Sequence, residues 1–566
     1  MQIPCCFFSF HHLPPKAISM GIPIPDSVLI PTLTTLLLIL SSMALSAQTP
    51  SHQTLLDCLS DHSNSPSSSP ISQVTFFPDN PSYSPVLNSY IRNLRFASPT
   101  TPKPLFIVAP THVSHIQATI LCCRIHALEI RIRSGGHDYD GLSYVSDSPF
   151  VILDMFNLRS VAVDIEDESA WVDSGATLGE VYYKIAEKSK IHGFPAGVCP
   201  TVGVGGHLSG AGYGNLMRKF GVSVDNVVDA LIVDVNGRVL DRETMGEDLF
   251  WAIRGGGGAS FGVIVSWKFK LVLLPETVTV FRTEKTIEEG VVDILHKWQE
   301  IADTIDENLF IRVVILPVNK KTQKTAKAKF VSLFLGNAQK LFALMSERFP
   351  ELGIKGEDCK EMSWIDSILF WSNYPIGTPL DVLLERQPNS EKFLKKKSDY
   401  VQEPISKAGL EGMMRKMIEL KRPALTFNPY GGKMSQIPET ETPFPHRAGN
   451  KYKIQYSVTW KEEGDEAAAK HLEMIRELYK YMTPYVSKSP RSAYLNYRDV
   501  DLGVNGIGNA SYWEGSIWGR KYFKGNFDRL VKVKSMVDPD NFFKYEQSIP
   551  CVELEAFDSN GRAESL

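Results

Sequence analysis

Short apolar runs separated by polar and glycine-rich turns follow one another along the chain after residue 104. Such runs occupy residues 105–109, 129–133, 150–154 and 169–173, and helical patches lie between them. A short apolar run bounded by turn residues is typical of a buried strand. We therefore predict that helices and strands alternate in this part of the chain.

The pattern changes near Glu276, where we place a domain boundary. Amphipathic helices such as 338–348 then become common, and the alternation of residues 452–460 predicts a strand. The last segment, 525–549, predicts a helix that ends at Asp538-Pro539, because proline disfavours the helical conformation in the residue before it.

An apolar stretch at residues 27–40 lies close to the N-terminus and ends in small residues, among them Ala44 and Ala47. The stretch is short and Pro31 lies near its start, which favours a cleaved signal peptide over residues 1–47. A retained membrane anchor is the alternative. Cleavage would make the mature protein a secreted one with no stable membrane association.

Secretion would place the remaining cysteines in an oxidising compartment, which permits disulfides. Spacing alone does not determine which of them pair. The cysteines that follow the predicted signal peptide are Cys58, Cys122, Cys123, Cys199, Cys359 and Cys551. Asn509 begins an N-glycosylation sequon, so we also predict a glycoprotein.

The charge balance of the chain excludes some classes of partner. Its 566 residues include 60 Lys and Arg against 64 Asp and Glu, which gives a formal net charge of −4. A nucleic-acid-binding protein needs a basic face to replace the counterions of the phosphates. We therefore expect no nucleic-acid partner, and a globular enzyme with a small-molecule substrate becomes the first hypothesis.

Two glycine clusters indicate a backbone that approaches a ligand closely. Six of the sixteen residues from Cys199 to Gly214 are glycine, and a second cluster occupies 255–258. Glycine costs conformational entropy, so such density is typical of turns with positive φ or of main chain pressed against a ligand. A loop-rich β region is the alternative.

The segment from Gly258 to Gly262 also matches GxSxG, the nucleophile elbow of serine hydrolases, with Ser260 as the nucleophile. Its context argues against that function, because an elbow needs a strand before the serine and a helix after it. The glycines lack the Lys-Ser/Thr ending of a P-loop, and no GxGxxG opens a helix as in a Rossmann nicotinamide site. A glycine turn whose N–H groups bind a cofactor phosphate fits better.

Two side chains with reactive groups stand in these glycine-rich segments. His137 follows a predicted strand and a Gly-Gly turn. A metal site with Asp138 or Asp140 is one alternative for it, but no second cluster has ligand spacing. Cys199 stands among prolines and glycines, so its thiol is either disulfide-bonded or reacts with a ligand.

Polar residues on one strand and a tyrosine beside an arginine are candidates for substrate chemistry. Alternation places Lys453 and Gln455 on one face of the predicted strand, although a solvated face is the simpler interpretation. Tyr497 precedes Arg498, and a nearby cation favours a phenolate that can act as a general base. Aromatic packing is the alternative for Tyr497.

Taken together, the motifs resemble those of the berberine bridge enzyme-like family of plant FAD-linked oxidases, which have the fold of vanillyl-alcohol oxidase and p-cresol methylhydroxylase (PCMH). The motifs are Arg133-Ser-Gly-Gly-His-Asp138, the segment Pro195 to His207, Asn496-Tyr-Arg-Asp499, and Val537 to Phe543.

The resemblance implies a two-domain α+β fold. A PCMH-type FAD-binding domain would occupy 77–276, and a C-terminal berberine-bridge-type segment, 490–551, would complete it. A substrate-binding domain at 277–489 would be built on an antiparallel sheet with helices. We also expect a monomer.

The resemblance further implies that FAD is bound bicovalently, through His137 and Cys199. It suggests a disulfide between Cys58 and Cys122, which leaves Cys123 free. It places the following residues in contact with FAD: Arg133, Ser134, Gly135, Gly136, Asp138, Thr201, Val202, Gly203, Gly205, Gly206, Gly262 and Asn541.

In alcohol-oxidising members of this family, the positions of Tyr213, Lys453, Gln455 and Tyr497 carry the catalytic residues. The resemblance implies that Tyr497 deprotonates a substrate hydroxyl, near Lys453, while hydride moves to flavin N5. Gln455 and Tyr213 would orient the substrate. Members that close a ring through an N-methyl group have a carboxylate in place of Gln455, so the glutamine argues against berberine-bridge chemistry.

The residue three positions after the tethering cysteine controls access of O2 in this family, and here it is Val202. Its small side chain resembles the oxidase type, which produces hydrogen peroxide. We therefore expect oxidation of CH–OH groups with O2 as acceptor, the substrate being a phenylpropanoid (monolignol-type) alcohol or a carbohydrate such as an oligosaccharide.

Two alternatives remain for the function, an oxidase of an alkaloid or other specialised metabolite and a non-catalytic secreted flavin-binding protein. The expected location is extracellular, in the cell wall (apoplast), with the vacuole or endomembrane lumen as alternatives.

Overall fold

A computed structural model describes residues 50–552 except 321–322, 388–391 and 507–510. The predicted signal peptide at 1–47 and the sequon residue Asn509 lie outside the described residues. The α-helices of the described residues are α2 (His52–His62), α3 (Tyr83–Ser89), α4 (Val113–Ile125), α5 (Leu178–Lys188), α6 (Val204–Ser209), α7 (Met217–Phe220), α8 (Arg242–Ile253), α9 (Val291–Ile301), α10 (Ala338–Arg348), α11 (Trp364–Trp371), α12 (Lys407–Leu420), α13 (Asp465–Tyr481), α14 (Tyr512–Phe523) and α15 (Asn526–Val537).

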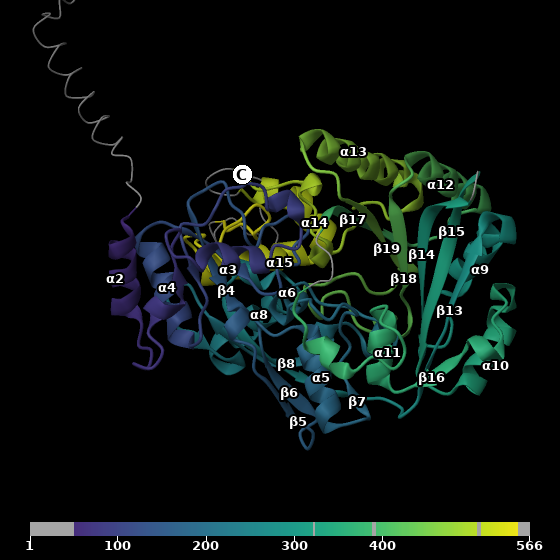
Figure 1. Ribbon diagram of the computed structural model, residues 1–566, viewed down its shortest axis with the longest axis horizontal. Coiled ribbons are helices and arrows are strands. Elements are labelled where there is room, and N and C mark those ends of the chain that lie inside the picture. The colour runs from purple at the N-terminus through teal and green to yellow at the C-terminus, as the bar shows by residue number, and fades with distance from the viewer. Residues whose placement is uncertain (1–49, 321–322, 388–391, 507–510, 553–566) are drawn as a thin grey trace, which may run out of the picture. The chain divides into compact units, whose positions relative to one another are not determined.

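Two sheets form from the part of the chain before residue 271 (Figure 1). A four-stranded sheet has the order β1-β2-β4-β3, with β4 parallel to both β2 and β3, and a five-stranded antiparallel sheet has the order β5-β6-β10-β8-β9. Their strands are β1 (Thr75–Phe76), β2 (Ile107–Val108), β3 (Glu129–Arg133), β4 (Phe150–Asp154), β5 (Val161–Asp164), β6 (Ser169–Asp173), β8 (Val227–Val233), β9 (Val239–Leu240) and β10 (Val263–Lys270). Strands β3, β4 and β6 confirm three of the predicted apolar runs, whereas the run at 105–109 contains only the short β2.

A small two-stranded sheet pairs β7 (His192–Gly193) with β11 (Val272–Leu273). The large sheet of the described residues follows it in the chain and has the order β16-β12-β15-β14-β18-β19-β17, with β13 also paired to β15. Its strands are β12 (Val278–Val280), β13 (Arg282–Thr286), β14 (Leu309–Lys320), β15 (Gln323–Phe334), β16 (Lys360–Met362), β17 (Phe393–Val401), β18 (Ala424–Pro429) and β19 (Tyr452–Trp460).

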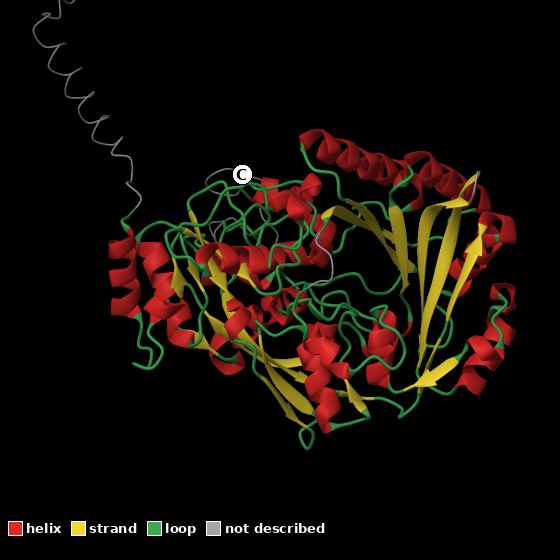
Figure 2. Cartoon of the chain, viewed as in Figure 1, coloured by secondary structure: helices red, strands yellow, loops and turns green. Residues whose placement is uncertain are grey.

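Helices cover one face of the large sheet, and the opposite face is turned toward the first half of the chain (Figure 2). Helices α9, α12 and α13 contribute to a hydrophobic core with Val313, Phe427 and Ile454, one residue from each of three neighbouring strands. Since side chains alternate along a strand, the neighbours Arg312 and Gln455 lie on the other face, where they line a cavity. The predicted helix at 338–348 and the predicted strand at 452–460 are confirmed as α10 and β19.

The C-terminal segment packs against the glycine cluster that precedes β10. The ammonium of Lys534 in α15 is buried, pairs with Asp538 and donates hydrogen bonds to the carbonyls of Ser260 and Phe543. The Ser260 hydroxyl is itself buried and accepts a hydrogen bond from the Ile549 N–H. Two segments far apart in the sequence therefore hold each other in place. The domain limits 77–276, 277–489 and 490–551 stay a prediction.

A disulfide joins helices α2 and α4. Cys58 in α2 is bonded to Cys122 in α4, and Cys123 is free and buried, which confirms the pairing implied by the resemblance. Within the residues that the structure describes, no helix is both long and apolar enough to cross a membrane.

Arg133, at the end of β3, forms a fully buried ion pair. Its guanidinium contacts Asp154 at 2.5 Å and donates hydrogen bonds to the carbonyls of Val86 and Leu87. Removing one partner of a buried pair leaves the other as an unpaired charge in the interior. Arg133 therefore connects two strands and α3.

We predict that Arg133→Met lowers the free energy of unfolding by about 3–5 kcal/mol, because it leaves the Asp154 carboxylate buried without its cation. Urea-induced unfolding followed by tryptophan fluorescence measures this change. Arg159→Met is the control, since the half-exposed Arg159 lies 3.5 Å from Glu180, which keeps a second pair with Arg386, and its loss should change stability little. Equal losses in the two variants would contradict the prediction.

Candidate functional site

A single continuous cavity of about 580 Å³ lies between the glycine-rich loops and the free face of the large sheet. Its volume is within the range of small-molecule sites. The wall combines the turn after β3, the Cys199 loop, the strands β14, β17, β18 and β19, and the Asn-Tyr-Arg-Asp segment. Segments more than 300 residues apart in the sequence thus meet at one site.

The turn after β3 brings His137 to the cavity wall. Gly136 has φ of 66°, and a Cβ there would lie 1.8 Å from the Tyr90 carbonyl oxygen, so this turn requires glycine. The Nε2 atom of His137 is hydrogen-bonded to the Thr201 hydroxyl at 3.0 Å. Burial, with smaller contributions from Arg92 and Lys396, lowers the pKa of His137 to about 3. The ring is therefore neutral at physiological pH and keeps a nucleophilic nitrogen.

The loop that carries Cys199 is fixed through its backbone. The Tyr182 hydroxyl donates to the Gly197 carbonyl at 2.7 Å, and the Gly179 N–H donates to the Pro200 carbonyl at 2.8 Å. Of the free cysteines in the described residues, Cys199 alone is exposed, and it lines the cavity. A thiol on a rigid loop with access to a cavity is able to react with a bound ligand.

The two loops contact each other backbone to backbone. A Cβ on Gly203 would lie 2.1 Å from the Ser134 hydroxyl oxygen, and a Cβ on Gly135 would lie 2.4 Å from the Gly203 nitrogen. Neither position has space for a side chain. This contact places His137 and Cys199 on the wall of the same cavity.

The cavity wall has the groups that FAD requires. The hydroxyls of Ser143 and Ser174 and one guanidinium nitrogen of Arg498 are buried and have no hydrogen-bond partner among the described residues. Such donors can bind the hydroxyl and phosphate oxygens of a dinucleotide. At Gly206 a Cβ would meet no atom within 4 Å, so the main chain there is open to a ligand. We conclude that the residues present fit FAD.

A cluster of tyrosines surrounds a buried lysine at the other end of the cavity. The hydroxyls of Tyr213 and Tyr497 are hydrogen-bonded to each other. The Lys453 ammonium lies 3.3 Å from the ring centre of Tyr213, 3.6 Å from that of Tyr494 and 4.9 Å from that of Tyr497. It has no hydrogen-bond partner among the described residues, so the rings are its principal contacts.

Burial sets the electrostatics of this cluster. It raises the pKa of Tyr497 well above 10, with a further increase from Tyr213, while Arg312 acts in the opposite direction. Burial likewise lowers the pKa of Lys453 well below its usual value, and Arg312 contributes to this decrease. A proton that leaves Tyr497 therefore needs a compensating positive charge nearby.

Most of the residues expected at the site line the cavity, and some do not. Those on the wall are Ser134, Gly135, Gly136, His137, Asp138, Cys199, Val202, Gly203, Gly205, Gly206, Tyr213, Gly262, Gln455 and Tyr497. Thr201 and Lys453 do not line it but contact residues that do. Arg133 is held in its pair with Asp154, and Asn541 lies buried in the turn after α15 with φ of 51°. Neither of these two residues lines the cavity.

The sequence analysis missed several wall residues, among them Tyr139, Lys396 and Arg312. The Tyr139 hydroxyl accepts hydrogen bonds from Gln455 and Lys396, each at 3.3 Å. The Arg312 guanidinium donates to the Asn428 side chain at 2.7 Å and also lines the cavity. Tyr139 could have been found from its place two residues after His137. No sequence signal distinguishes Lys396 or Arg312 from surface residues of a strand.

Comparisons with known proteins support the assignment of these segments. A family model described as FAD binding domain matches residues 104–242, and one described as Berberine and berberine like matches residues 493–550. Berberine bridge enzyme-like 21 of Arabidopsis thaliana is 56% identical over 507 residues, which cover 89% of this chain and 94% of that protein.

Solved structures are similar over nearly the same length. The structure of BBE-like protein 28 from Arabidopsis thaliana has 47% identity and a TM-score of 0.83, and it covers 89% of this chain and 100% of its own. The wild-type grass pollen allergen Phl p 4, described as a glucose dehydrogenase, has 46% identity and a TM-score of 0.84. It covers 88% of this chain and 100% of its own. A variant of that allergen with valine in place of one isoleucine is described as a glucose oxidase.

Proposed function

The chain belongs to the berberine bridge enzyme-like family of FAD-binding oxidoreductases, and we propose that it is a secreted oxidase that converts an alcohol to a carbonyl compound with bicovalently bound FAD. The observation that carries this proposal is the convergence of four groups on one cavity: His137, Cys199 and the hydrogen-bonded pair Tyr213 and Tyr497. Two of them can hold a flavin, and two can act on a substrate hydroxyl.

The tethers use the two reactive groups on the glycine loops. The neutral His137 nitrogen and the exposed Cys199 thiol are both nucleophiles on fixed loops, so these two residues would hold the isoalloxazine. When bound, FAD supplies the acceptor for the substrate hydride, and O2 is the final acceptor. The overall reaction is alcohol plus O2 to carbonyl compound plus hydrogen peroxide.

The proton of the substrate hydroxyl goes to Tyr497. A phenolate at Tyr497 is stabilised by the hydrogen bond that the Tyr213 hydroxyl donates and by the Lys453 ammonium near its ring. Gln455, whose amide reaches Tyr139, orients the substrate oxygen.

The nature of the wall favours a carbohydrate as substrate. Gln455, Thr426, Arg312 and Lys396 present polar groups where the large sheet meets the cavity, and these can bind several hydroxyls. The glucose activities described for the pollen allergen and its variant support the same class. A phenylpropanoid alcohol is the second candidate, favoured by Tyr139 and Tyr497, whose ring centres are 5.8 Å apart at the wall.

Peroxide release measured with glucose, oligosaccharides and cinnamyl-type alcohols separates the two substrate classes. Release with none of them would favour a non-catalytic flavin-binding protein.

The flavin linkage is tested by acid precipitation followed by peptide mass mapping. We expect flavin to stay on the precipitated wild-type chain and to cross-link the peptides of His137 and Cys199. The single variants His137→Ala and Cys199→Ala should each keep the flavin through the other residue, and the double variant should release it. Cys359→Ala is the control, because this thiol is free and buried. Flavin released from the wild-type chain would rule out the covalent attachment.

The base is tested by Tyr497→Phe. We expect the rate of flavin reduction at saturating substrate to fall by about 10²–10⁴-fold, the usual contribution of a positioned general base, with little change in KM. Stopped-flow absorbance of the flavin measures this rate. Tyr430→Phe is the control, since Tyr430 is buried and hydrogen-bonded to Tyr400 without lining the cavity. A wild-type rate in Tyr497→Phe would refute the assignment.

The pH dependence of the same rate tests the role of Lys453. Since burial raises the pKa of Tyr497 well above 10, the phenolate fraction and the rate should increase with pH through the neutral and mildly alkaline range. Lys453→Met removes the cation that favours the phenolate, so the pH profile should move to higher pH and the rate at pH 7 should fall. An unchanged profile would show that Lys453 carries no charge when the proton is transferred.

Access of O2 is tested by Val202→Ile. The extra methyl group narrows the cavity beside Cys199, and we expect reoxidation of the reduced flavin by O2 to slow on the order of tenfold, a barrier increase of about 1.4 kcal/mol. In the pollen allergen, a variant with valine in place of one isoleucine is described as a glucose oxidase. Val314→Ile makes the same change elsewhere on the wall and should leave reoxidation unchanged. Equal effects of both variants would contradict the prediction.

A further inference from the structure

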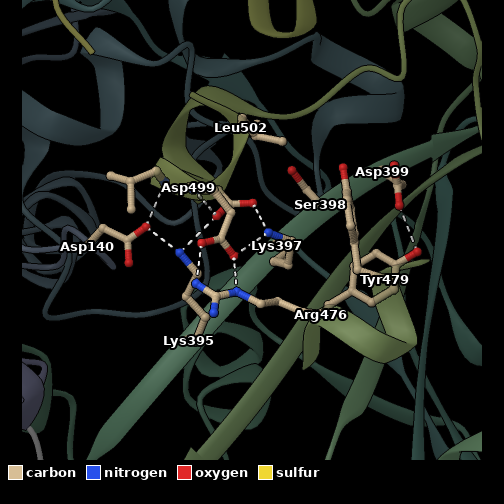
Figure 3. Close-up of polar contacts among 12 residues, drawn as sticks. Asp140, Lys395, Lys397, Ser398, Asp399, Arg476, Tyr479, Asp499 and Leu502 are labelled. Carbon is tan, nitrogen blue, oxygen red and sulfur yellow. Dashed lines mark hydrogen bonds and ion pairs between the residues drawn. The ribbon is translucent and has the colours of Figure 1, made fainter. Parts of the chain in front are cut away.

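Six charged side chains of alternating sign form a continuous row at the edge of the large sheet (Figure 3). We call them the charge row, and its members in order are Asp140, Lys395, Asp499, Lys397, Asp501 and Arg476.

The contacts within the charge row are short and two-sided. The Lys395 ammonium lies 2.6 Å from Asp140 and 2.8 Å from Asp499, and the Lys397 ammonium lies 2.6 Å from Asp499 and 2.8 Å from Asp501. Each carboxylate thus contacts two cations, since Asp140 also pairs with Arg95, and Asp501 with Arg476. No member of the row lines the cavity.

Most of the charge row is removed from water. The side chains of Asp140, Lys395, Lys397 and Asp499 are at most 2% exposed, whereas that of Arg476 is 47% exposed. Burying this many charges is costly, and the attraction between them offsets the cost only if every partner is in place. A small displacement of any segment that carries the row would separate its charges. The row therefore favours one arrangement of these segments.

Those segments include the one that carries the proposed base, Tyr497, and two others that line the cavity. Asp140 follows His137 by three residues and accepts a hydrogen bond from the Val500 N–H at 2.9 Å. Along β17, Lys395 and Lys397 alternate with Leu394 and Lys396, which line the cavity. The row thus joins the flavin loop, the edge strand and the Asn-Tyr-Arg-Asp segment.

Tyr497 stands between two attachments to the same strand. On its N-terminal side, the Tyr494 N–H donates to the Ser398 hydroxyl at 2.9 Å. On its C-terminal side, Asp499 contacts both Lys395 and Lys397. The backbone that carries the phenol is therefore held to β17 at both ends, and its position depends on the charge row.

We propose that the charge row, with Asp499 at its centre, is a positioning device that holds the Tyr497 hydroxyl at the distance from the substrate needed for proton transfer. The inference rests on the proposed function, in which Tyr497 is the base. Asp499 is a positioning residue: it touches neither cofactor nor substrate and acts through the backbone of Tyr497. A displacement of about 1 Å at a reacting group can reduce a rate by about a hundredfold.

The test uses Asp499→Asn in the flavin-loaded protein, with glucose as the first substrate and then the alcohol that is reduced fastest in the screen. We expect the rate of flavin reduction at saturating substrate to fall by about ten- to a hundredfold. Substrate binding, measured from the flavin absorbance, should change by no more than about twofold, because the residues that bind the substrate are untouched. Mass mapping of the covalent flavin verifies that loading is unchanged.

A matched control separates positioning from stability. Arg491→Gln breaks another buried ion pair of the same strand, with Asp399 at 2.6 Å, but that pair does not reach the Asn-Tyr-Arg-Asp segment. Both variants should unfold at lower temperature, and only Asp499→Asn should lose the rate. If Asp499→Asn does not fold, Arg476→Gln at the exposed end of the row replaces it, with a smaller loss of the same kind.

A double-mutant cycle gives the decisive result. In a Tyr497→Phe background, Asp499→Asn (or Arg476→Gln) should cause no further loss of rate, because the group that it positions is absent. An equal loss in both backgrounds, or a loss as small as that of Arg491→Gln, would overturn the positioning role. A wild-type rate in Tyr497→Phe would instead overturn the proposed base.

Discussion

Close backbone packing between two glycine-rich loops is the constraint on which the rest of the site depends. The turn after β3 and the loop before α6 approach so closely that a Cβ on Gly135 or on Gly203 would overlap atoms of the other loop. Because of this contact, His137 and Cys199, which are 62 positions apart by their numbers, line the same cavity. Side chains at the glycine positions would separate the loops, and one ligand could then reach only one of the two nucleophiles.

Buried ion pairs determine how the distant segments meet around that contact. Arg133 with Asp154 connects two strands of the four-stranded sheet, and Lys534 with Asp538 fixes the C-terminal helix against the glycine cluster. The charge row does the same at β17, the strand at one end of the large sheet. A row of alternating charges loses its compensation when it is displaced. The charges also occupy the edge of the sheet, where an uncovered strand would invite pairing with another chain.

The sequence allowed much of this to be predicted, and the failures share one cause. Apolar runs identified β3, β4 and β6, and alternation identified β19, because local periodicity reflects which side of a strand is buried. The family motifs located His137, Cys199 and Tyr497, and the cavity brings them together. The sequence analysis assigned no role to the consecutive lysines 395–397, of which two are buried by carboxylates more than a hundred residues away and the third lines the cavity. Arg133 likewise belongs to a family motif, but its side chain is buried in an ion pair with Asp154 and does not line the cavity. Ion-pair partners that only the tertiary structure brings together cannot be recognised from the local sequence pattern.

The surroundings of Lys453 show why the polar network and the proposed chemistry depend on each other. Burial disfavours a charge on Lys453 and on Tyr497 alike, since it lowers the pKa of the amine and raises that of the phenol. An ammonium and a phenolate side by side are each other's compensation, so transfer of one proton creates both charges without changing the net charge of the interior. Tyr213 and Tyr494 enclose the ammonium with their ring faces, which attract cations but accept no proton. The site can therefore gain a strong base only while Tyr497 is held next to Lys453, and that proximity is what the attachments of its backbone to β17 maintain.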